Sequence, residues 1–335
     1  MELKQKDKFR ILVIGDPHFK VSNVRETEEM SEKILSTAFS ISPDLIVCLG
    51  DVLDRHDQIS VFPFKRAVEF LSKLTSITEV VVLIGNHDRP NNSTYLTDEH
   101  PFLACKQWKN LTIVDSVISK EYVGRKFLFV PYVPSGRFAE TLEIDPEWKN
   151  STCIFAHQEF TGAKMGPVIS SVENWRLDFP LIVSGHIHDF QEVAPNLLYV
   201  GTPIQHGFAD SIDKTISLFT WDFSNSSPNY SHERIDLGCQ KKKVIHVSPN
   251  QIDSFHPAQN TVTKLVIEGT ASELKALIKS SKVSTLREAG VEVRFKTLNE
   301  TPSFRYSKRN YQETLRNLIG EDSRQLKWYT QISSS

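Results

Sequence analysis

The chain has 335 residues, of which 39% are hydrophobic, so it can bury one large core and still form a second, smaller domain. Lysine and arginine (39) nearly balance aspartate and glutamate (41), which gives a net charge of -2. This balance excludes binding of a polyanion through an overall positive field, so tight binding of nucleic acid would need a local basic face or a partner that supplies positive charge.

The sequence also indicates the cellular compartment in which the protein acts. No apolar run approaches the roughly 20 residues of a membrane span, and no apolar signal segment follows Met1. The four cysteines are scattered and form no CxxC pair, so we expect buried free thiols and a reducing compartment. We therefore expect a soluble intracellular protein without a membrane partner, in the cytoplasm or nucleoid of a cell, or in the host cell of a virus.

Four apolar runs predict strands that are buried on both faces, each bounded by polar residues. They are residues 11–14, 45–49, 80–84 and 181–183. Amphipathic helices are expected after the first two strands, with apolar residues at helical spacing. Their stripes are Met30, Ile34 and Ala38 in one helix and Phe64, Val68, Leu71 and Leu74 in the other. Alternating strands and helices of this kind are typical of right-handed crossovers in a parallel sheet.

The later sequence is richer in short strands, which predicts two sheets packed face to face with helices outside. The sequence becomes basic and polar near residue 240, where three lysines follow Gln240. Beyond them the sequence predicts two strands, then a helix and then a third strand. The helix begins with a capping box from Thr270 to Glu273. We therefore predict a first domain at residues 1–238, a small α/β domain at 239–300 and a helical tail at 301–335.

Polar residues that suit metal ions follow the predicted buried strands. They are Asp16, His18, Asp51, Asn86, His87, His157, His186 and His188. Ligands of such sheets bind at the carboxyl ends of the strands, so we expect these side chains to converge. Mixed Asp, Asn and His ligation suits Mn²⁺, Fe²⁺ or Zn²⁺ better than Ca²⁺. Seven candidate ligands exceed the needs of one ion and match two ions about 3.5–4 Å apart, which leaves His87 as a proton donor to the leaving group.

Each of these motifs has an ordinary structural explanation when it stands alone. Asp16 with His18 is weak evidence for metal ligands by itself. Asp51 after a glycine and Asn86 are both common in turns, and His157 alone indicates a hydrogen-bonded core histidine. The stretch Gly185-His-Ile-His188 is stronger evidence, because two histidine rings at a buried strand end are costly to bury without a function. The joint pattern favours a site for two metals.

Taken together, and in their order along the chain, these motifs resemble the signature of the calcineurin-like metallophosphoesterases. The resemblance covers residues 9–222. The resemblance implies a two-sheet αββα sandwich and two divalent ions, with Mn²⁺ favoured and Mg²⁺, Fe²⁺ or Zn²⁺ as alternatives. It assigns one metal to Asp16, His18, Asp51 and His188. It assigns the other metal to Asp51, Asn86, His157 and His186. By the same resemblance His87 protonates the leaving group and Asp54 is the carboxylate that orients it, while Arg55 stands where the phosphatase branch has a phosphate-binding arginine.

A further resemblance concerns the branch of this family. The run from Leu198 to Gln205, and the long polar loop after Asp88, are similar to the double-strand-break repair nucleases typified by bacterial SbcD. The small domain after residue 238 is placed like the capping domain of those nucleases, and the compact length is similar to phage forms. The resemblance implies an Mn²⁺-dependent DNA exonuclease and endonuclease that acts in DNA end processing, recombination or repair. It also implies a homodimer and an SbcC-like coiled-coil ATPase partner that docks on a C-terminal segment, here Tyr311 to Trp328.

Two other functions remain open at this point. A phosphoesterase for a small nucleotide or a phosphoprotein is the alternative within the same fold, and it is favoured by Asp54-Arg55 and by the absence of a strong basic stripe. A catalytically silent scaffold on this fold usually lacks the first histidine or the histidine pair. This chain keeps both, which argues against a scaffold.

Overall fold

The computed structural model describes the chain at residues 7–56, 58–224 and 229–298. Within these residues the chain forms two compact units, each with its own hydrophobic core. The first unit runs through Val244 and also includes His256–Lys264. The second unit holds Ile245–Phe255 and continues from Leu265.

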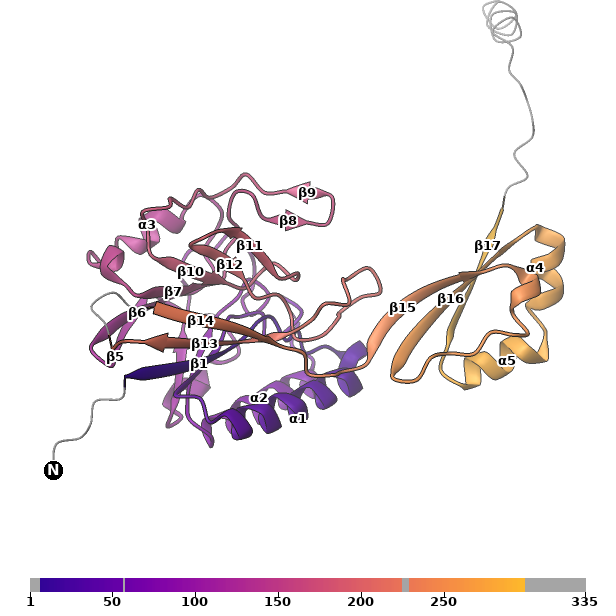
Figure 1. Cartoon of the computed structure of the whole chain (residues 1–335), viewed down its shortest axis with the longest axis horizontal. Helices are drawn as coiled ribbons and strands as arrows, with labels where there is room; N and C mark the ends of the chain where they lie inside the picture. Colours follow the sequence, from indigo (N-terminus) through magenta and orange to yellow (C-terminus); the bar gives the residue numbers. More distant parts are fainter. Residues whose placement is uncertain (1–6, 57, 225–228, 299–335) are drawn as a thin grey trace, which may run out of the picture. The chain divides into compact units, whose positions relative to one another are not determined.

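The first unit is built on two six-stranded sheets (Figure 1). In the first sheet the order is β14-β13-β1-β2-β3-β4. Four neighbouring strands of this sheet are parallel: β1 (Lys8–Ile14), β2 (Leu45–Cys48), β3 (Glu79–Leu83) and β4 (Leu111–Val114). Antiparallel pairing extends the sheet beyond β1 through β13 (Ile216–Asp222) and β14 (Asn229–Ile235).

The second sheet has the order β11-β12-β10-β7-β6-β5. Its parallel strands are β6 (Arg125–Val130), β7 (Cys153–Ala156), β10 (Leu181–Ser184) and β12 (Leu197–Tyr199). Its edges pair antiparallel, through β5 (Ile118–Tyr122) and β11 (Gln191–Ala194). A separate hairpin is formed by β8 (Lys164–Met165) and β9 (Val168–Ile169).

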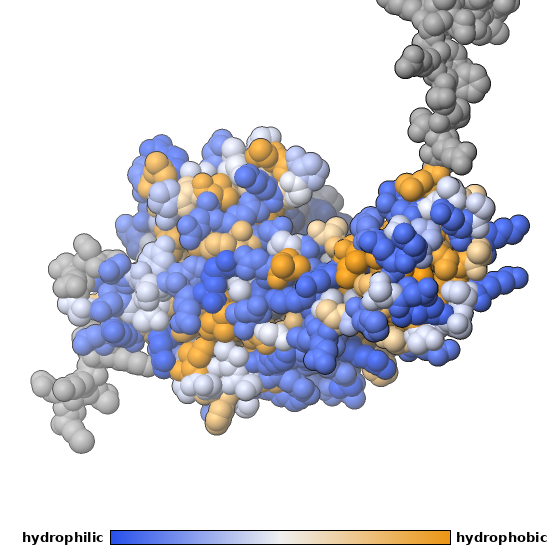
Figure 2. Space-filling view, turned by 45° about the vertical axis from the view of Figure 1, so that its right-hand side comes forward, coloured by the Kyte–Doolittle hydropathy of each residue, from blue (hydrophilic) through white to orange (hydrophobic). Residues whose placement is uncertain are grey.

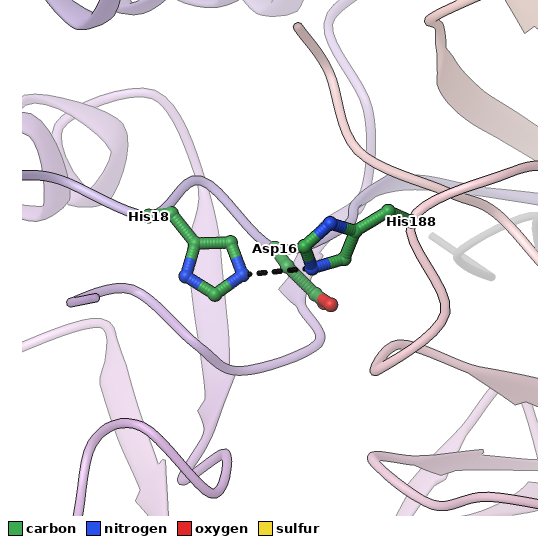
Figure 3. A group of neighbouring side chains, drawn as sticks. All are labelled: Asp16, His18 and His188. Atoms are coloured by element: carbon green, nitrogen blue, oxygen red, sulfur yellow. Dashed lines mark hydrogen bonds between the residues drawn. The ribbon is translucent and has the colours of Figure 1, made fainter. Parts of the chain in front are cut away.

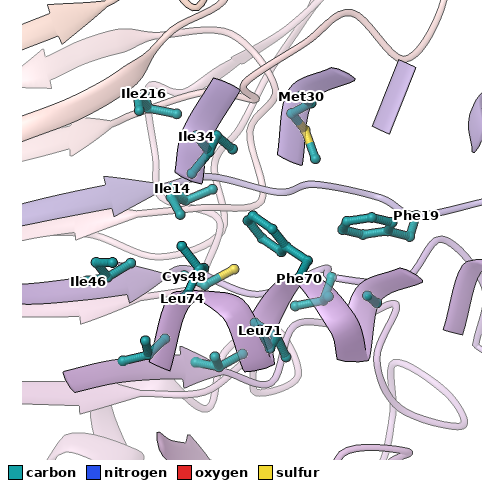
Figure 4. Close-up of a cluster of buried hydrophobic side chains, with 14 of the residues drawn as sticks. Ile14, Phe19, Met30, Ile34, Ile46, Cys48, Phe70, Leu71, Leu74 and Ile216 are labelled. Carbon is teal, nitrogen blue, oxygen red and sulfur yellow. The ribbon is translucent and has the colours of Figure 1, made fainter. Parts of the chain in front are cut away.

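The strands are apolar along their length because each sheet is covered on both faces. Leu12 and Ile14 of β1 pack against two helices, α1 (Val24–Ile41) and α2 (Val61–Thr75), as Figure 4 shows for Ile14. Ile11 and Val13, which point the opposite way, pack in the core shared with the second sheet. The predicted helices are therefore confirmed, and their apolar stripes face the first sheet.

The outer face of the second sheet is covered as well. Leu128 and Ile154 pack there against Phe138 of α3 (Phe138–Leu142) and Trp148 of the 3-10 helix η3 (Trp148–Asn150). The order of layers is thus helices, sheet, sheet, helices. This order confirms the predicted αββα sandwich.

A three-stranded sheet follows residue 240, in the order β15 (Lys241–Val247), β16 (Thr261–Gly269) and β17 (Glu292–Thr297). Its core packs against two helices, α4 (Ala271–Leu277) and α5 (Ser281–Glu288). The predicted start of α4 is confirmed: the Thr270 hydroxyl accepts from the Glu273 amide, and the Glu273 carboxylate accepts from the Thr270 amide at 2.8 Å. Helix α5 is absent from the sequence-based prediction because only Val283 and Leu286 mark its buried face.

The remaining short helices are η1 (Val21–Asn23), η2 (Leu103–Gln107) and η4 (Pro249–Gln251). No helix among the described residues is both long and apolar enough to span a membrane. Figure 2 shows one face of the molecule, in which polar surface predominates and apolar residues gather in separate patches. The predicted tail at residues 301–335, with its docking segment from Tyr311 to Trp328, lies outside the described residues.

Candidate metal centre

Five strands end at the candidate site, three from the first sheet and two from the second. The first sheet brings Asp16 and His18 after β1, Asp51 after β2, and Asn86 and His87 after β3. The second sheet brings His157 after β7, and His186 and His188 after β10. The carboxyl ends of parallel strands form the edge at which such sheets bind ligands. The structure therefore brings together all the residues that the sequence singled out as metal ligands.

One group of donor atoms combines Asp16, His18 and His188, whose ligand atoms all lie within 4.8 Å of one another (Figure 3). The Nε2 atoms of the two histidines face each other at 3.1 Å. The Asp16 carboxylate is fully buried, and one of its oxygens, Oδ2, accepts from the His186 amide at 2.8 Å. Its other oxygen, Oδ1, is buried without a hydrogen-bond partner among the described residues. A buried acceptor without a partner, beside two histidine nitrogens, fits a cation.

The second group combines Asp51, His157 and His186. The side-chain oxygen of Asn86 joins this group, because it lies 3.0 Å from His157 Nε2 and 2.9 Å from His186 Nδ1. The other ring nitrogen of His157, Nδ1, donates to the Leu49 carbonyl at 2.8 Å. This contact fixes the ring so that Nε2 points at the site, which is how a carbonyl commonly orients a metal-binding histidine.

Asp51 lies between the two groups. Its Oδ2 atom is 3.8 Å from His18 Nε2 in the first group and 3.4 Å from His157 Nε2 in the second. Its Oδ1 atom is occupied, since it accepts from the His87 amide at 2.8 Å. One carboxylate oxygen is thus shared by both donor groups, as a site for two neighbouring ions requires.

The backbone around the site is held in an unusual conformation. His18, Asp51 and His186 have φ values of 46°, 46° and 77°, in the left-handed region that costs non-glycine residues about 1–3 kcal/mol each. Two neighbouring glycines leave room for the carboxylates. A Cβ on Gly85 would lie 2.3 Å from Asp51 Oδ1, and a Cβ on Gly185 would lie 2.5 Å from Asp16 Oδ1. The close packing of these turns places the donor atoms.

The electrostatics of the site suit cation binding. Burial lowers the pKa of His18 and of His186 to about 3 each, so both rings are neutral and free to act as ligands. Burial also opposes a charge on His157, but the carboxylates of Asp51 and Asp16 outweigh it and raise the pKa of His157 to about 9. Its proton then lies between the Asp51 and Asn86 oxygens, in the place where a divalent cation would compensate the same charge.

His87 lies beside these groups and belongs to neither. Its Nδ1 donates to the backbone carbonyl of Asp54 at 2.8 Å, which leaves Nε2 free, 4.0 Å from Asp51 Oδ2. The prediction that the Asp54 carboxylate orients His87 is wrong, because the bond to His87 comes from the Asp54 main chain. That carboxylate is directed instead to Lys20 at 3.2 Å and lies 3.6 Å from His18 Nδ1. Asp54 orients His87 through its main chain, a role that sequence spacing alone does not reveal.

Three residues near the site were not identified from the sequence. His206 donates from Nε2 to the Asp16 carbonyl at 3.0 Å, and its ring meets that of His18 edge-on, with centroids 4.8 Å apart. His56 stacks on His87 with centroids 4.6 Å apart. Asp88 accepts from three backbone amides in the loops that carry the donor groups. Of these, only Asp88 had a signal in the sequence, as the last residue of the Gly85–Asp88 motif.

Comparison with known proteins identifies the family of this chain. Residues 9–190 match the calcineurin-like phosphoesterases. Two viral relatives, whose names class them as phosphoesterases, are 35% identical to this chain. Protein 078R of Invertebrate iridescent virus 3 aligns over 302 residues, 88% of this chain and 86% of the relative. Protein 244L of Invertebrate iridescent virus 6 aligns over 284 residues, 83% of this chain and 100% of the relative.

Among solved structures, the phosphoesterase Yfce from E. coli is 13% identical, covers 68% of this chain and 100% of its own, and has a TM-score of 0.33. The family match and the two viral relatives show that this chain belongs to the calcineurin-like phosphoesterase family. It is therefore a metal-dependent hydrolase of phosphoester bonds, from a family that uses a dinuclear metal site.

Proposed function

We propose that the chain is an Mn²⁺-dependent DNA exonuclease and endonuclease. The observation that carries the proposal is the position of His87. Its side chain is 33% exposed at the edge of both donor groups, with Nδ1 held by the Asp54 carbonyl and Nε2 free. A histidine in this position can give a proton to an oxygen that leaves phosphorus. The sugar alkoxide released from a phosphodiester needs such a proton.

In this proposal, different residues of the chain bind the metals and donate the proton. Asp16, His18 and His188 would hold one ion, while Asn86, His157 and His186 would hold the other, with Asp51 shared between them. When bound, two divalent ions neutralise charge on the phosphate oxygens and lower the pKa of water. His87 adds general-acid catalysis, an effect of ~10²–10⁴-fold in enzymes that use it. We favour Mn²⁺, as the resemblance to the nuclease branch implies, and the carboxylate and amide oxygens of the donor groups suit this ion.

The site loop after β12 supports the nuclease branch of the family. Thr202, in the run from Leu198 to Gln205, donates to the His188 carbonyl at 3.1 Å and so braces a proposed ligand. Gln205 exchanges two hydrogen bonds with the backbone of Lys242, at 2.7 and 3.1 Å. The run that resembles the nucleases therefore connects the donor groups to the start of β15, from which the chain leads into the second unit.

The partners of this enzyme are part of the same proposal. A net charge of -2 gives the chain little general attraction for DNA. We propose that it acts as a homodimer with an SbcC-like coiled-coil ATPase, which adds DNA affinity. The expected dimer surface is formed by α1 and α2, where Phe39, Val61 and Phe62 are exposed.

The proposal is tested by comparing three substrates in Mn²⁺ and in Mg²⁺: a linear DNA duplex, a dinucleotide and p-nitrophenyl phosphate. A DNA nuclease is expected to cleave the duplex in Mn²⁺ and to turn over the monoester poorly. Efficient hydrolysis of the monoester, with the duplex left intact, would reject the proposal in favour of the alternative below.

The alternative is a phosphoesterase for a small nucleotide or a phosphoprotein. One observation favours it: Arg55 is exposed one residue after Asp54, and no hydrogen bond or ion pair engages its side chain within the described part of the chain. A free guanidinium at this place can bind a terminal phosphate in bidentate fashion. Replacement of Arg55 by alanine would then raise KM for monoesters much more than for DNA.

A further inference from the structure

A cavity of about 490 Å³ lies against His87. Its volume is within the range of about 300–1,000 Å³ that ligand pockets have in proteins. None of the seven proposed metal ligands lines it. The cavity is therefore a neighbour of the metal centre rather than a part of it, and the two share the proton donor.

The walls of this cavity combine apolar and polar groups. Ile59, Pro90 and Pro101 supply apolar surface, and Ile59 is 54% exposed at this point. Arg55 and Glu99 supply charges of opposite sign. A carboxylate disfavours a second phosphate here, while apolar walls with a donor and an acceptor suit a flat, uncharged ring with a polar edge.

Three further residues of the lining carry polar atoms that the protein leaves unsatisfied. His56 Nδ1, Arg89 Nε and His100 Nδ1 are buried and have no hydrogen-bond partner among the described residues. Arg89 and His100 are 2% and 9% exposed, so these nitrogens have little access to bulk water. These nitrogens are enclosed by protein and do not face the open cavity, so the polar groups that the cavity offers to a ligand are the Arg55 and Glu99 side chains.

We infer that this cavity receives the nucleoside attached to the leaving oxygen. The inference rests on the proposed function, in which His87 gives its proton to that oxygen, so the group bonded to the oxygen extends past His87. A nucleobase has two apolar faces for the walls and a polar edge for the Arg55 guanidinium and the Glu99 carboxylate. His56, which stacks on His87, connects the base-binding wall to the proton donor.

The experiment uses the dinucleotide d(TpT) and two analogues in which one nucleoside is replaced by an abasic tetrahydrofuran unit. The product that lacks phosphate identifies the leaving nucleoside. Removal of the base from that nucleoside is expected to lower kcat/KM at least about 5-fold, since one stacked base contributes ~1 kcal/mol or more in nucleic-acid-binding proteins. Bis(p-nitrophenyl) phosphate serves as the substrate without a nucleoside.

The cavity is tested by measuring the same ratio in Ile59→Ala. In this variant the preference for the intact leaving nucleoside is expected to fall toward one. Ile144→Ala is the matched control, because Ile144 is 52% exposed and does not line the cavity, and this variant is expected to keep the wild-type ratio. Each ratio compares two substrates on one protein, so a general loss of folding or of metal cancels.

The outcomes separate this inference from the proposed function. Equal rates on d(TpT) and on its analogue without the leaving base would overturn the pocket and leave the nuclease standing. An unchanged preference in Ile59→Ala would overturn the placement in this cavity. Failure to cleave d(TpT) while bis(p-nitrophenyl) phosphate is hydrolysed would overturn the proposed function, and the inference with it.

Discussion

Replacement of Asp88 tests how the loops around the site are fixed to one another. The hydrogen bonds of the Asp88 side chain involve none of the proposed metal donor atoms, so the test does not remove a ligand. Asp88 is 1% exposed. Its Oδ1 accepts from the Leu53 amide at 2.8 Å, and its Oδ2 accepts from the amides of Val52 and Gly85 at 3.1 Å each. One carboxylate therefore joins the loop after β2 to the loop after β3.

The structure gives an order of effects for two substitutions. Asp88→Ala leaves three buried amides without an acceptor, and at about 1–3 kcal/mol for each group the loss of stability is ~3 kcal/mol or more. In Asp88→Asn, an amide turned with its nitrogen at the Oδ1 position leaves only the Leu53 amide unpaired, which predicts a loss of ~1–3 kcal/mol. Domains have about 5–15 kcal/mol of stability in total, so the alanine variant is expected to be marginal.

Urea unfolding in the presence of EDTA measures this order without a contribution from bound metal. The expected stabilities are wild type above Asp88→Asn above Asp88→Ala. Asp98→Ala serves as the control, since Asp98 is an exposed carboxylate in the loop that follows, and surface changes of this kind stay within about 0.5 kcal/mol of wild type. Asparagine and alanine variants that are equally stable, or that match the control, would refute the reasoning.

Three other changes test the ion pair at Asp115, the close packing at Gly185 and the need for metal. Burial alone would raise the pKa of Asp115, but its hydrogen bonds to His100 (3.0 Å) and Lys106 (2.5 Å) hold it below the usual value. A depressed pKa stabilises the fold above the unfolded value of about 3.9, so Asp115→Asn should lower the urea midpoint at pH 7 and lose this effect as the pH falls below about 4. Gly185→Ala should reduce the metal bound per chain by elemental analysis, because its Cβ would lie 2.5 Å from Asp16 Oδ1; Gly207→Ala, with nothing nearer than 3.7 Å, should not. Dialysis against EDTA should abolish hydrolysis of bis(p-nitrophenyl) phosphate, and Mn²⁺ should restore it; activity that survives chelation would contradict a metal-dependent reaction.

The core strands and the donor residues could be predicted from the sequence for one physical reason. A strand that is covered on both faces is apolar throughout, as in the run Ile11–Ile14, so polar residues directly after it mark the edge where ligands bind. This pattern located Asp16, His18 and Asp51 without any knowledge of which strands are neighbours. The arrangement in two sheets followed from the number of short strands.

Other features depend on contacts that a linear pattern does not contain. The family resemblance placed Asp54 near His87, but only the structure shows that the main-chain carbonyl, rather than the carboxylate, makes the contact. His206 is 190 residues away from its partner Asp16 along the chain, and no motif connects the two. The hairpin of β8 and β9 has exposed side chains throughout, so it lacks the apolar alternation that marks a half-buried strand.

The most direct test of the central claim compares wild type with His87→Ala on a linear DNA duplex in Mn²⁺, with bound metal measured on the same samples. Wild type is expected to cleave the duplex. His87→Ala is expected to lose about 10²–10⁴-fold in rate and to keep its metal, because the His87 side chain belongs to neither donor group. A variant that cleaves the duplex at the wild-type rate would contradict the role of His87, and a variant that loses its metal would contradict the division between the donor groups and the proton donor.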